Sequence, residues 1–234
     1  MLLAEFEVFH SRPITPTRRI SLGHLALPVD PLPGFGGVLL GGVVARFLGD
    51  LEPDLHPDLH RLIAQIDRGQ RIVQPRIRHR FQVDQVGLGR SIHRLVGDGE
   101  QIGFEFADTG SPVPQILGAV YAAERLADPA RHAVCAVLHR AARWTGPIGP
   151  SFIAHMSGLS EARTSSFVAF ADPVAWAMEI LGFPVGAAKP SRKEVLKQFR
   201  ARLMEAHPDH GGNERDASKA IGDLGEARRI LTEH

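Results

Sequence analysis

The pattern of apolar and polar positions divides the chain into a first part with strand and helix signals and a last part with helix signals alone. Residues 3–9 and 20–27 alternate or run apolar in the manner of strands, and residues 77–83 alternate apolar and polar side chains. The pair Asp98-Gly99 separates two further apolar runs, 91–96 and 101–106, as the turn of a hairpin does. These patterns predict several strands, two of them joined by a tight turn.

Helical segments are interspersed with these strands. Apolar residues at helical spacing predict a helix over 59–68, and prolines near the first turn open two more, over 112–126 and 129–144. The most apolar window, 34–44, is about half the ~20 residues that a membrane-spanning helix needs. It predicts a buried glycine-rich turn or short helix. We therefore expect an α+β domain in the first part.

The last part contains three successive helical patterns. Asp172-Pro173 offers an N-cap and a first-turn proline to a short helix that stops near Gly182. Ser191 and Glu194 form the capping-box pattern Ser-x-x-Glu, so a second helix should start there and run to about residue 206. A third helix is predicted over 214–232.

The second and third helices each have an apolar face. Val195, Phe199 and Leu203 lie four residues apart on the second helix, while Lys193, Lys197 and Arg200 project from its opposite side. The inward stripe of the third helix consists of Ile221, Leu224, Ala227 and Leu231. The simplest arrangement is an antiparallel hairpin of these two helices, braced by the short first helix.

Length and composition indicate two domains. The chain has 234 residues, which is long for one ordinary domain, and all four lysines lie after residue 188. Residues 145–150 carry the glycines and prolines that are typical of a domain edge. We therefore predict an α+β domain over 1–150, a connecting segment over 151–170 and a separate domain over 171–234.

Charge and cysteine content exclude several classes of protein. Lys and Arg number 27 against 26 Asp and Glu, so no global field draws the chain to nucleic acid or to an anionic membrane. Cys135 is the only cysteine, which excludes an intrachain disulfide and a cysteine-zinc site. No signal-peptide pattern opens the chain. We expect a cytoplasmic protein with no membrane partner and no metal.

The order and spacing of motifs over 171–234 resemble those of a J domain, the DnaJ-like co-chaperone family. The resemblance covers about a quarter of the chain. The loop that begins at His207 is similar to that of J proteins of the mitochondrial import-motor type. The matching residues are Asp172-Pro173, Glu179-Ile180-Leu181-Gly182, the loop His207-Pro208-Asp209 and Leu224-x-Glu226-Ala227-x-x-Ile230-Leu231.

This resemblance implies a fold and a function. The fold class would be an α+β N-terminal domain followed by an all-α C-terminal J domain. The function would be stimulation of ATP hydrolysis by a DnaK-type (heat-shock seventy-kilodalton) chaperone, with no catalysis and no cofactor of its own. In the family, the residue that matches Asp209 meets an arginine of the chaperone, and the basic helix face meets an acidic surface. The chaperone-binding residues would be His207, Pro208, Asp209, Lys193, Lys197 and Arg200.

The role of residues 1–150 is then that of a recruiter or adaptor for an unidentified protein target. The chain departs from the family pattern at five positions of its two long helices, which leaves open a degenerate J domain that does not activate a chaperone. These positions are Ala201, Arg202, Glu205, Ala206 and Arg228.

A second copy of the tripeptide, His56-Pro57-Asp58, lacks a basic amphipathic helix before it. Proline and an acidic residue favour the first turn of a helix, so this copy is expected to start the helix over 59–68. The tripeptide alone therefore does not define the function.

Two other functions were weighed for the first domain. The first is nucleic-acid binding by an Arg-rich face of residues 68–94, against which the scarcity of aromatic stacking residues counts. The second is an enzyme with a metal held by His56 and His60 near Asp54 and Asp58, but no His-Glu-x-x-His pattern is present. We expect neither nucleic acid as a partner nor catalysis.

Overall fold

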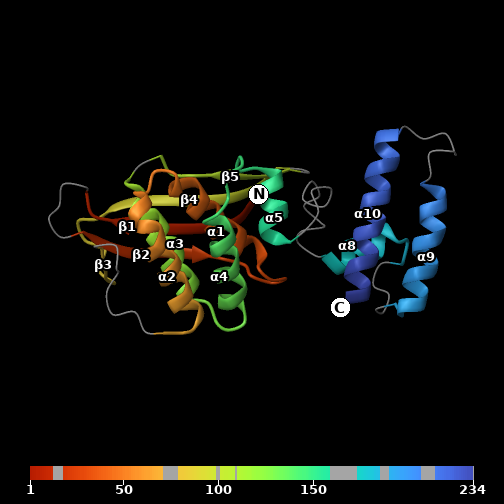
Figure 1. Cartoon of the computed structure of the whole chain (residues 1–234), viewed down its shortest axis with the longest axis horizontal. Coiled ribbons are helices and arrows are strands. Elements are labelled where there is room, and N and C mark those ends of the chain that lie inside the picture. Colours follow the sequence, from red (N-terminus) through yellow and green to blue (C-terminus); the bar gives the residue numbers. More distant parts are fainter. Residues whose placement is uncertain are drawn as a thin grey trace. The chain divides into compact units, whose positions relative to one another are not determined.

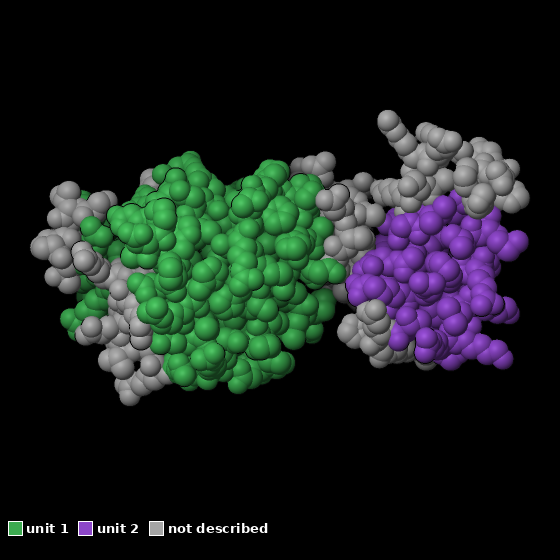
Figure 2. Space-filling view, viewed as in Figure 1, with its two compact units in different colours: residues 1–98, 102–158 green, residues 99–101, 159–234 purple. Residues whose placement is uncertain are grey.

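The computed structural model describes residues 1–12, 18–70, 79–98, 101–108, 110–158, 173–184, 190–206 and 214–233. The chain forms two compact units. The first unit comprises residues 1–98 and 102–158, and the second comprises 99–101 and 159–234 (Figure 2).

A five-stranded sheet forms the centre of the first unit. Its strands lie in the order β3-β2-β1-β4-β5. β1 is the central strand and pairs antiparallel with β2 and with β4, while the short β3 lies parallel to β2. The strands are β1 (Leu2–His10), β2 (Arg19–Ala26), β3 (Arg80–Phe81), β4 (Gly89–Asp98) and β5 (Gln101–Glu105).

Helices of the first unit pack on the sheet and on one another (Figure 1). α1 and α3 contact β1, and α4 packs on α1 and α2. Phe6 and Val8 of β1 are fully buried in the core of this unit. The helices are α1 (Gly34–Leu48), the 3-10 turn η1 (Pro53–Leu55), α2 (His56–Asp67), α3 (Pro112–Glu124), α4 (Ala130–Ala141) and α5 (Pro150–Ser157).

Glycines let α1 approach its neighbours closely. A Cβ atom on Gly42 would lie 2.4 Å from a ring carbon of Phe104, and one on Gly41 would lie 2.8 Å from a methyl carbon of Val137. The window over 34–44 is therefore part of a buried 15-residue helix, longer than the turn or short helix that we expected. None of the helices in the described part of the chain is long and apolar enough to span a bilayer.

Most of the described residues after 158 belong to three helices. α10 (Glu214–Glu233) packs against both α8 (Pro173–Ile180) and α9 (Arg192–Glu205) (Figure 1). Their shared core contains Trp176, Ala177, Met178, Leu181, Val195, Leu224, Ala227, Ile230 and Leu231. The predicted bounds of the last two helices are confirmed to within about a residue.

The apolar stripes of these helices differ in part from the predicted ones. Val195 is fully buried and Phe199 packs against the core, but Leu203 is only half-buried and lies outside it. On α10, Ile221 is exposed, and Ile230 takes part in the core instead.

The expected fold class is wrong. We expected an α+β N-terminal domain followed by an all-α C-terminal J domain, whereas the chain is mixed α/β, with a five-stranded sheet and eight α-helices among its described residues. An all-α J domain is not shown: the second unit takes in Gly99–Gln101 as well, and residues 207–213 lie outside the described ones. Helical spacing predicts single helices, and it does not define the fold into which they join. The α+β first part is compatible with the structure.

Two details of the first unit also differ from expectation. α5 packs on α1 and α4, so this unit extends to residue 158, beyond the predicted end at 150. Among the described residues of the strand predicted over 77–83, β3 comprises only Arg80 and Phe81, and Val83 is exposed in the loop that follows.

Candidate functional site

The N-terminus of α9 is fixed by a complete capping box. The Ser191 Oγ accepts a hydrogen bond from the Glu194 amide, and the Glu194 carboxylate accepts one from the Ser191 amide at 2.7 Å. The Ser191 hydroxyl also donates to this carboxylate at 2.6 Å, and the pKa of Glu194 is lowered by these hydrogen bonds. The start of the helix is therefore set by its own sequence.

One side of α9 carries three cations, which we call the cationic face. Lys193, Lys197 and Arg200 follow one another at intervals of four and three residues, and all three are exposed. The opposite side holds the buried Val195. Because residues at these intervals share one side of a helix, the cations form a single strip that faces solvent.

The predicted loop residues His207, Pro208 and Asp209 lie outside the described residues. α9 ends at Glu205 and α10 begins at Glu214, so in the sequence these three residues belong to the connection between the two helices. The structure thus describes three of the six predicted chaperone-binding residues.

The structure describes the surroundings of the α9 residues that differ from the J-domain pattern. Arg202 forms an ion pair with Glu205 at 3.2 Å, and its guanidinium lies against Gly182, where a Cβ atom would be 2.4 Å away. Ala206 packs against the core, and Ala201 is exposed. Arg202 therefore lies toward the end of α8 and is not part of the cationic face.

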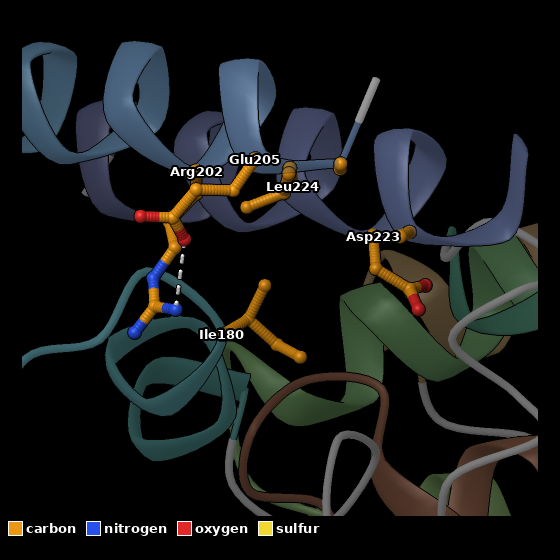
Figure 3. Close-up of a pocket in the computed structure, with 7 residues that line it drawn as sticks. Ile180, Arg202, Glu205, Asp223 and Leu224 are labelled. Carbon is orange, nitrogen blue, oxygen red and sulfur yellow. Dashed lines mark hydrogen bonds and ion pairs between the residues drawn. The ribbon is translucent and has the colours of Figure 1, made fainter. Parts of the chain in front are cut away.

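A pocket of about 320 Å³ lies between the C-terminal ends of α8 and α9 and the middle of α10. Figure 3 shows Ile180 from α8, Arg202 and Glu205 from α9, and Asp223 and Leu224 from α10 around it. Ala206 and Ala220 complete the lining. The lining combines four apolar side chains with three charged ones, and the sequence pattern did not predict this pocket because its lining residues come from three separate helices.

The first copy of the tripeptide lies at the start of α2, as expected. Pro57 occupies the first turn, and Asp58 accepts an ion pair from Arg61 at 3.0 Å. The helix begins at His56, three residues before the predicted start. This copy therefore serves local helix structure.

The metal site considered around His56 and His60 has different partners. The Nδ1 of His60 lies 3.3 Å from the Nδ1 of His139 on α4, and the two rings are within 8° of parallel. This arrangement is a hydrogen bond in which one ring donates and the other accepts. Among the described residues, no three His, Cys, Asp or Glu side chains are placed to hold a metal ion.

The Arg-rich face is partly neutralised. Arg90 pairs with the buried Glu7, and Arg94 pairs with Glu5 at 2.7 Å. Both arginines lie on β4 beside the glutamates of β1. Arg71, Arg76 and Arg78 lie outside the described residues, and Arg68 is exposed. The described part of this face therefore offers fewer free cations for phosphates than the sequence pattern suggests.

A buried polar network in the first unit was missed by the sequence analysis. The Ala107 amide donates to His93 Nδ1 at 3.3 Å, so the neutral ring carries its proton on Nε2 and donates to Gln115 Oε1 at 2.8 Å. The Gln115 amide donates to Ser91 Oγ at 3.0 Å, and His10 Nε2 lies 2.9 Å from the same hydroxyl.

Burial lowers the pKa values of His10 and His93, which keeps both rings neutral near pH 7. Ser91 is 1% exposed, so the network ties β1, β4 and α3 together inside the core. Two features of the sequence could have indicated this network. One is the alternation of residues along β4, and the other is the polar Gln115 within the otherwise apolar α3.

No known protein family, curated protein or solved structure matches this chain.

Proposed function

We propose that this protein is a co-chaperone that stimulates ATP hydrolysis by a DnaK-type chaperone through His207, Pro208 and Asp209. The first unit would then act as the recruiter that brings the chaperone to a target. The observation that carries the proposal is the cationic face of α9, a helix that ends two residues before His207.

The cationic face supports the proposal because its charges are available to a partner. Lys193, Lys197 and Arg200 have no ion-pair partner among the described residues, whereas Arg202 is paired within the helix. A surface of one sign steers a partner of the opposite sign and sets its orientation. The resemblance of this segment to J-domain co-chaperones gives that partner as a DnaK-type chaperone.

The loop supplies the specific contact in this proposal. A hydrogen bond from a charged group of the chaperone to the Asp209 carboxylate contributes about 1.5–3 kcal/mol. A differential contact of that size shifts a two-state chaperone by about one to two orders of magnitude. Pro208 has a fixed φ and no amide donor, which restricts the backbone of the loop.

The test is single-turnover ATP hydrolysis by the DnaK-type chaperone of the same organism, with the full chain added. The wild-type protein should raise the rate, and His207→Gln should remove the effect. The chain provides a matched control in its other copy of the tripeptide, because His56→Gln makes the same chemical change in the first unit, away from the cationic face. The proposal is contradicted if the wild type and His207→Gln stimulate hydrolysis equally while circular dichroism shows that both are folded.

Nucleic-acid binding is the competing function. No described contact favours it over the co-chaperone function, because Arg90 and Arg94 are held by glutamates of β1.

A further inference from the structure

The loop that joins β3 to β4 exposes two apolar side chains. Val83 is 84% exposed and Val86 is 78% exposed, the highest values among the large apolar residues in the described part of the chain. Scattered exposed apolar side chains are common on protein surfaces. Here two β-branched residues, three positions apart, project from one short loop.

Hydrogen bonds hold this loop against β2. The Ser21 hydroxyl donates to the Val83 carbonyl at 3.1 Å, and the Gln85 side chain donates to the Leu22 carbonyl at 2.9 Å. Asp84 accepts a hydrogen bond from the Val86 amide at 3.0 Å, which closes the turn between the two valines. The loop therefore presents the valines from a defined backbone.

Three arginines without carboxylate partners flank this loop. Arg19 on β2 is the register partner of Arg80 on β3, and the Arg80 amide donates to the Arg18 carbonyl at 2.8 Å. A Cβ atom on Gly87 would lie 4.0 Å from the guanidinium of Arg19, which places that side chain against the loop. In the described residues, no Asp or Glu lies within ion-pair distance of Arg18, Arg19 or Arg80.

The same sheet shows how the chain neutralises arginine elsewhere. Arg90 and Arg94 on β4 are each paired with a glutamate of β1. Like charges on neighbouring strands destabilise a sheet, so the unpaired Arg19 and Arg80 are unfavourable in the free protein. An anionic partner would remove that repulsion.

We propose that Val83 and Val86, with Arg18, Arg19 and Arg80, form a docking surface for anionic phospholipid membranes. The valines would enter the boundary between headgroups and acyl chains, and the arginines would contact lipid phosphates. An apolar signal alone gives only marginal membrane binding and a basic patch adds to it, and this surface combines the two. The carboxylate of Asp84 opposes anionic lipid, but three cations outweigh it.

Other anionic partners fit this surface less well. Bases of single-stranded nucleic acid need exposed aromatic rings to stack on. Phe81, the aromatic residue next to the loop, instead packs on Tyr121 with ring centroids 4.8 Å apart. The phosphate backbone of a nucleic acid offers no apolar surface to the two exposed valines, whereas the acyl chains of a lipid do.

This inference goes beyond the proposed co-chaperone function and does not depend on it. It differs from the expectation of no membrane partner, because neither the exposure of the valines nor the absence of ion pairs was visible in the sequence. It concerns contact with a membrane surface only.

The test is co-sedimentation of the full chain with vesicles of phosphatidylcholine alone or mixed equally with phosphatidylserine. The wild-type protein should sediment with the mixed vesicles and dissociate as salt is added. Val83→Asp combined with Val86→Asp should remove binding. Arg19→Gln combined with Arg80→Gln should weaken it at least tenfold, since each basic residue near such a surface contributes about 1 kcal/mol.

Leu32→Asp and Arg46→Gln are the matched controls, because both side chains are exposed elsewhere in the first unit. Both controls should bind as the wild type does. The proposal is overturned if wild type does not bind mixed vesicles, if the loop variants bind as wild type does, or if an oligonucleotide binds in place of the vesicles. All variants should keep their stimulation of the chaperone, so failure here is distinguishable from failure of the proposed function.

Discussion

The guanidinium of Arg228 on α10 lies over the ring of Phe199 on α9, 4.7 Å from the ring centroid. This cation-π contact shields the outer side of a ring whose inner side packs on the core of the three helices. Arg228 stands where the resembled family often has an aromatic residue. An arginine can cover such a ring with its apolar stem and its planar head.

Truncation of this pair should loosen α9 from α10. We expect Phe199→Ala to lower the stability of the three-helix core by about 2 kcal/mol, because the ring is only partly buried. Arg228→Ala should cost about 0.5–1 kcal/mol. Hydrogen–deuterium exchange of the α9 and α10 amides measures this core separately from the first unit. Lys197→Ala, on the exposed face, is the control and should leave the exchange unchanged.

Reversal of charge on the cationic face should weaken chaperone binding. Lys197→Glu combined with Arg200→Glu replaces two attractive contacts by repulsive ones, and we expect affinity to fall about tenfold. Raising the salt concentration should weaken the wild type as well, because exposed charges are screened over about 8–10 Å. Titration of the chaperone by fluorescence anisotropy measures both effects. Arg46→Glu, an exposed reversal on α1, should leave binding unaltered; affinity that ignores both salt and the double reversal contradicts electrostatic docking.

The pair His60 and His139 should make stability depend on pH. Burial lowers the pKa of each ring below the usual 6.5, and repulsion from Arg143 and from histidine neighbours adds to it. Below pH 6.5 the unfolded chain therefore binds more protons than the folded one, so the free energy of unfolding should fall as the pH is lowered through this range. Above the unfolded pKa the stabilisation is complete.

Urea unfolding at pH 7.5 and at pH 5.5 checks this sign. His139→Gln should reduce the loss of stability between the two, because one titrating ring is removed while a hydrogen-bonding group is retained. His10 and His93 also have lowered pKa values, so part of the loss should persist in this variant. A wild type that is more stable at the lower pH contradicts the assignment of neutral, buried rings.

Removal of the central amide of the buried polar network should be costly. Gln115→Met removes one hydrogen bond from His93 and one from Ser91. A buried polar group that loses its partner costs about 1–3 kcal/mol. We expect a total loss of about 3 kcal/mol in urea unfolding. Gln70→Met, at an exposed position after α2, should change the stability by less than about 0.5 kcal/mol.

Two glycine substitutions should have opposite effects. Gly42→Ala places a methyl group against the Phe104 ring and should destabilise the first unit by about 1–3 kcal/mol. Gly49→Ala meets nothing within 4 Å, and its helical backbone suits alanine, so it should stabilise the unit by about 0.4–1 kcal/mol. Thermal unfolding of both variants tests whether the glycines of α1 are needed for close packing and not for their backbone conformation.

Local signals in the sequence were sufficient for most helices. The capping box of Ser191 and Glu194 and the spacing of Val195 and Phe199 defined α9, because these are interactions between residues a few positions apart. The extent of α1 was missed, since its glycines look like breakers until the packing of Phe104 and Val137 against them is known.

Long-range features escaped the sequence analysis for a related reason. Alternation predicted a strand that includes Val83, but pairing of β3 with β2 ends at Phe81, and the chain leaves the sheet there. The contacts of Arg94 with Glu5 and of His93 with Gln115 join residues far apart in the sequence. Neither the neutralised arginines nor the buried network has a local pattern.

The glutamates of β1 are sheltered and each pairs with an arginine of β4, whereas the cations of α9 and the arginines beside the loop of Val83 have no carboxylate partner among the described residues. Dissolved ions reach the second group far more readily than the first. A moderate rise in ionic strength should therefore dissociate partners bound at these unpaired cations while the sheet stays folded. In this chain, binding to partners should therefore depend on salt concentration much more strongly than the stability of the fold does.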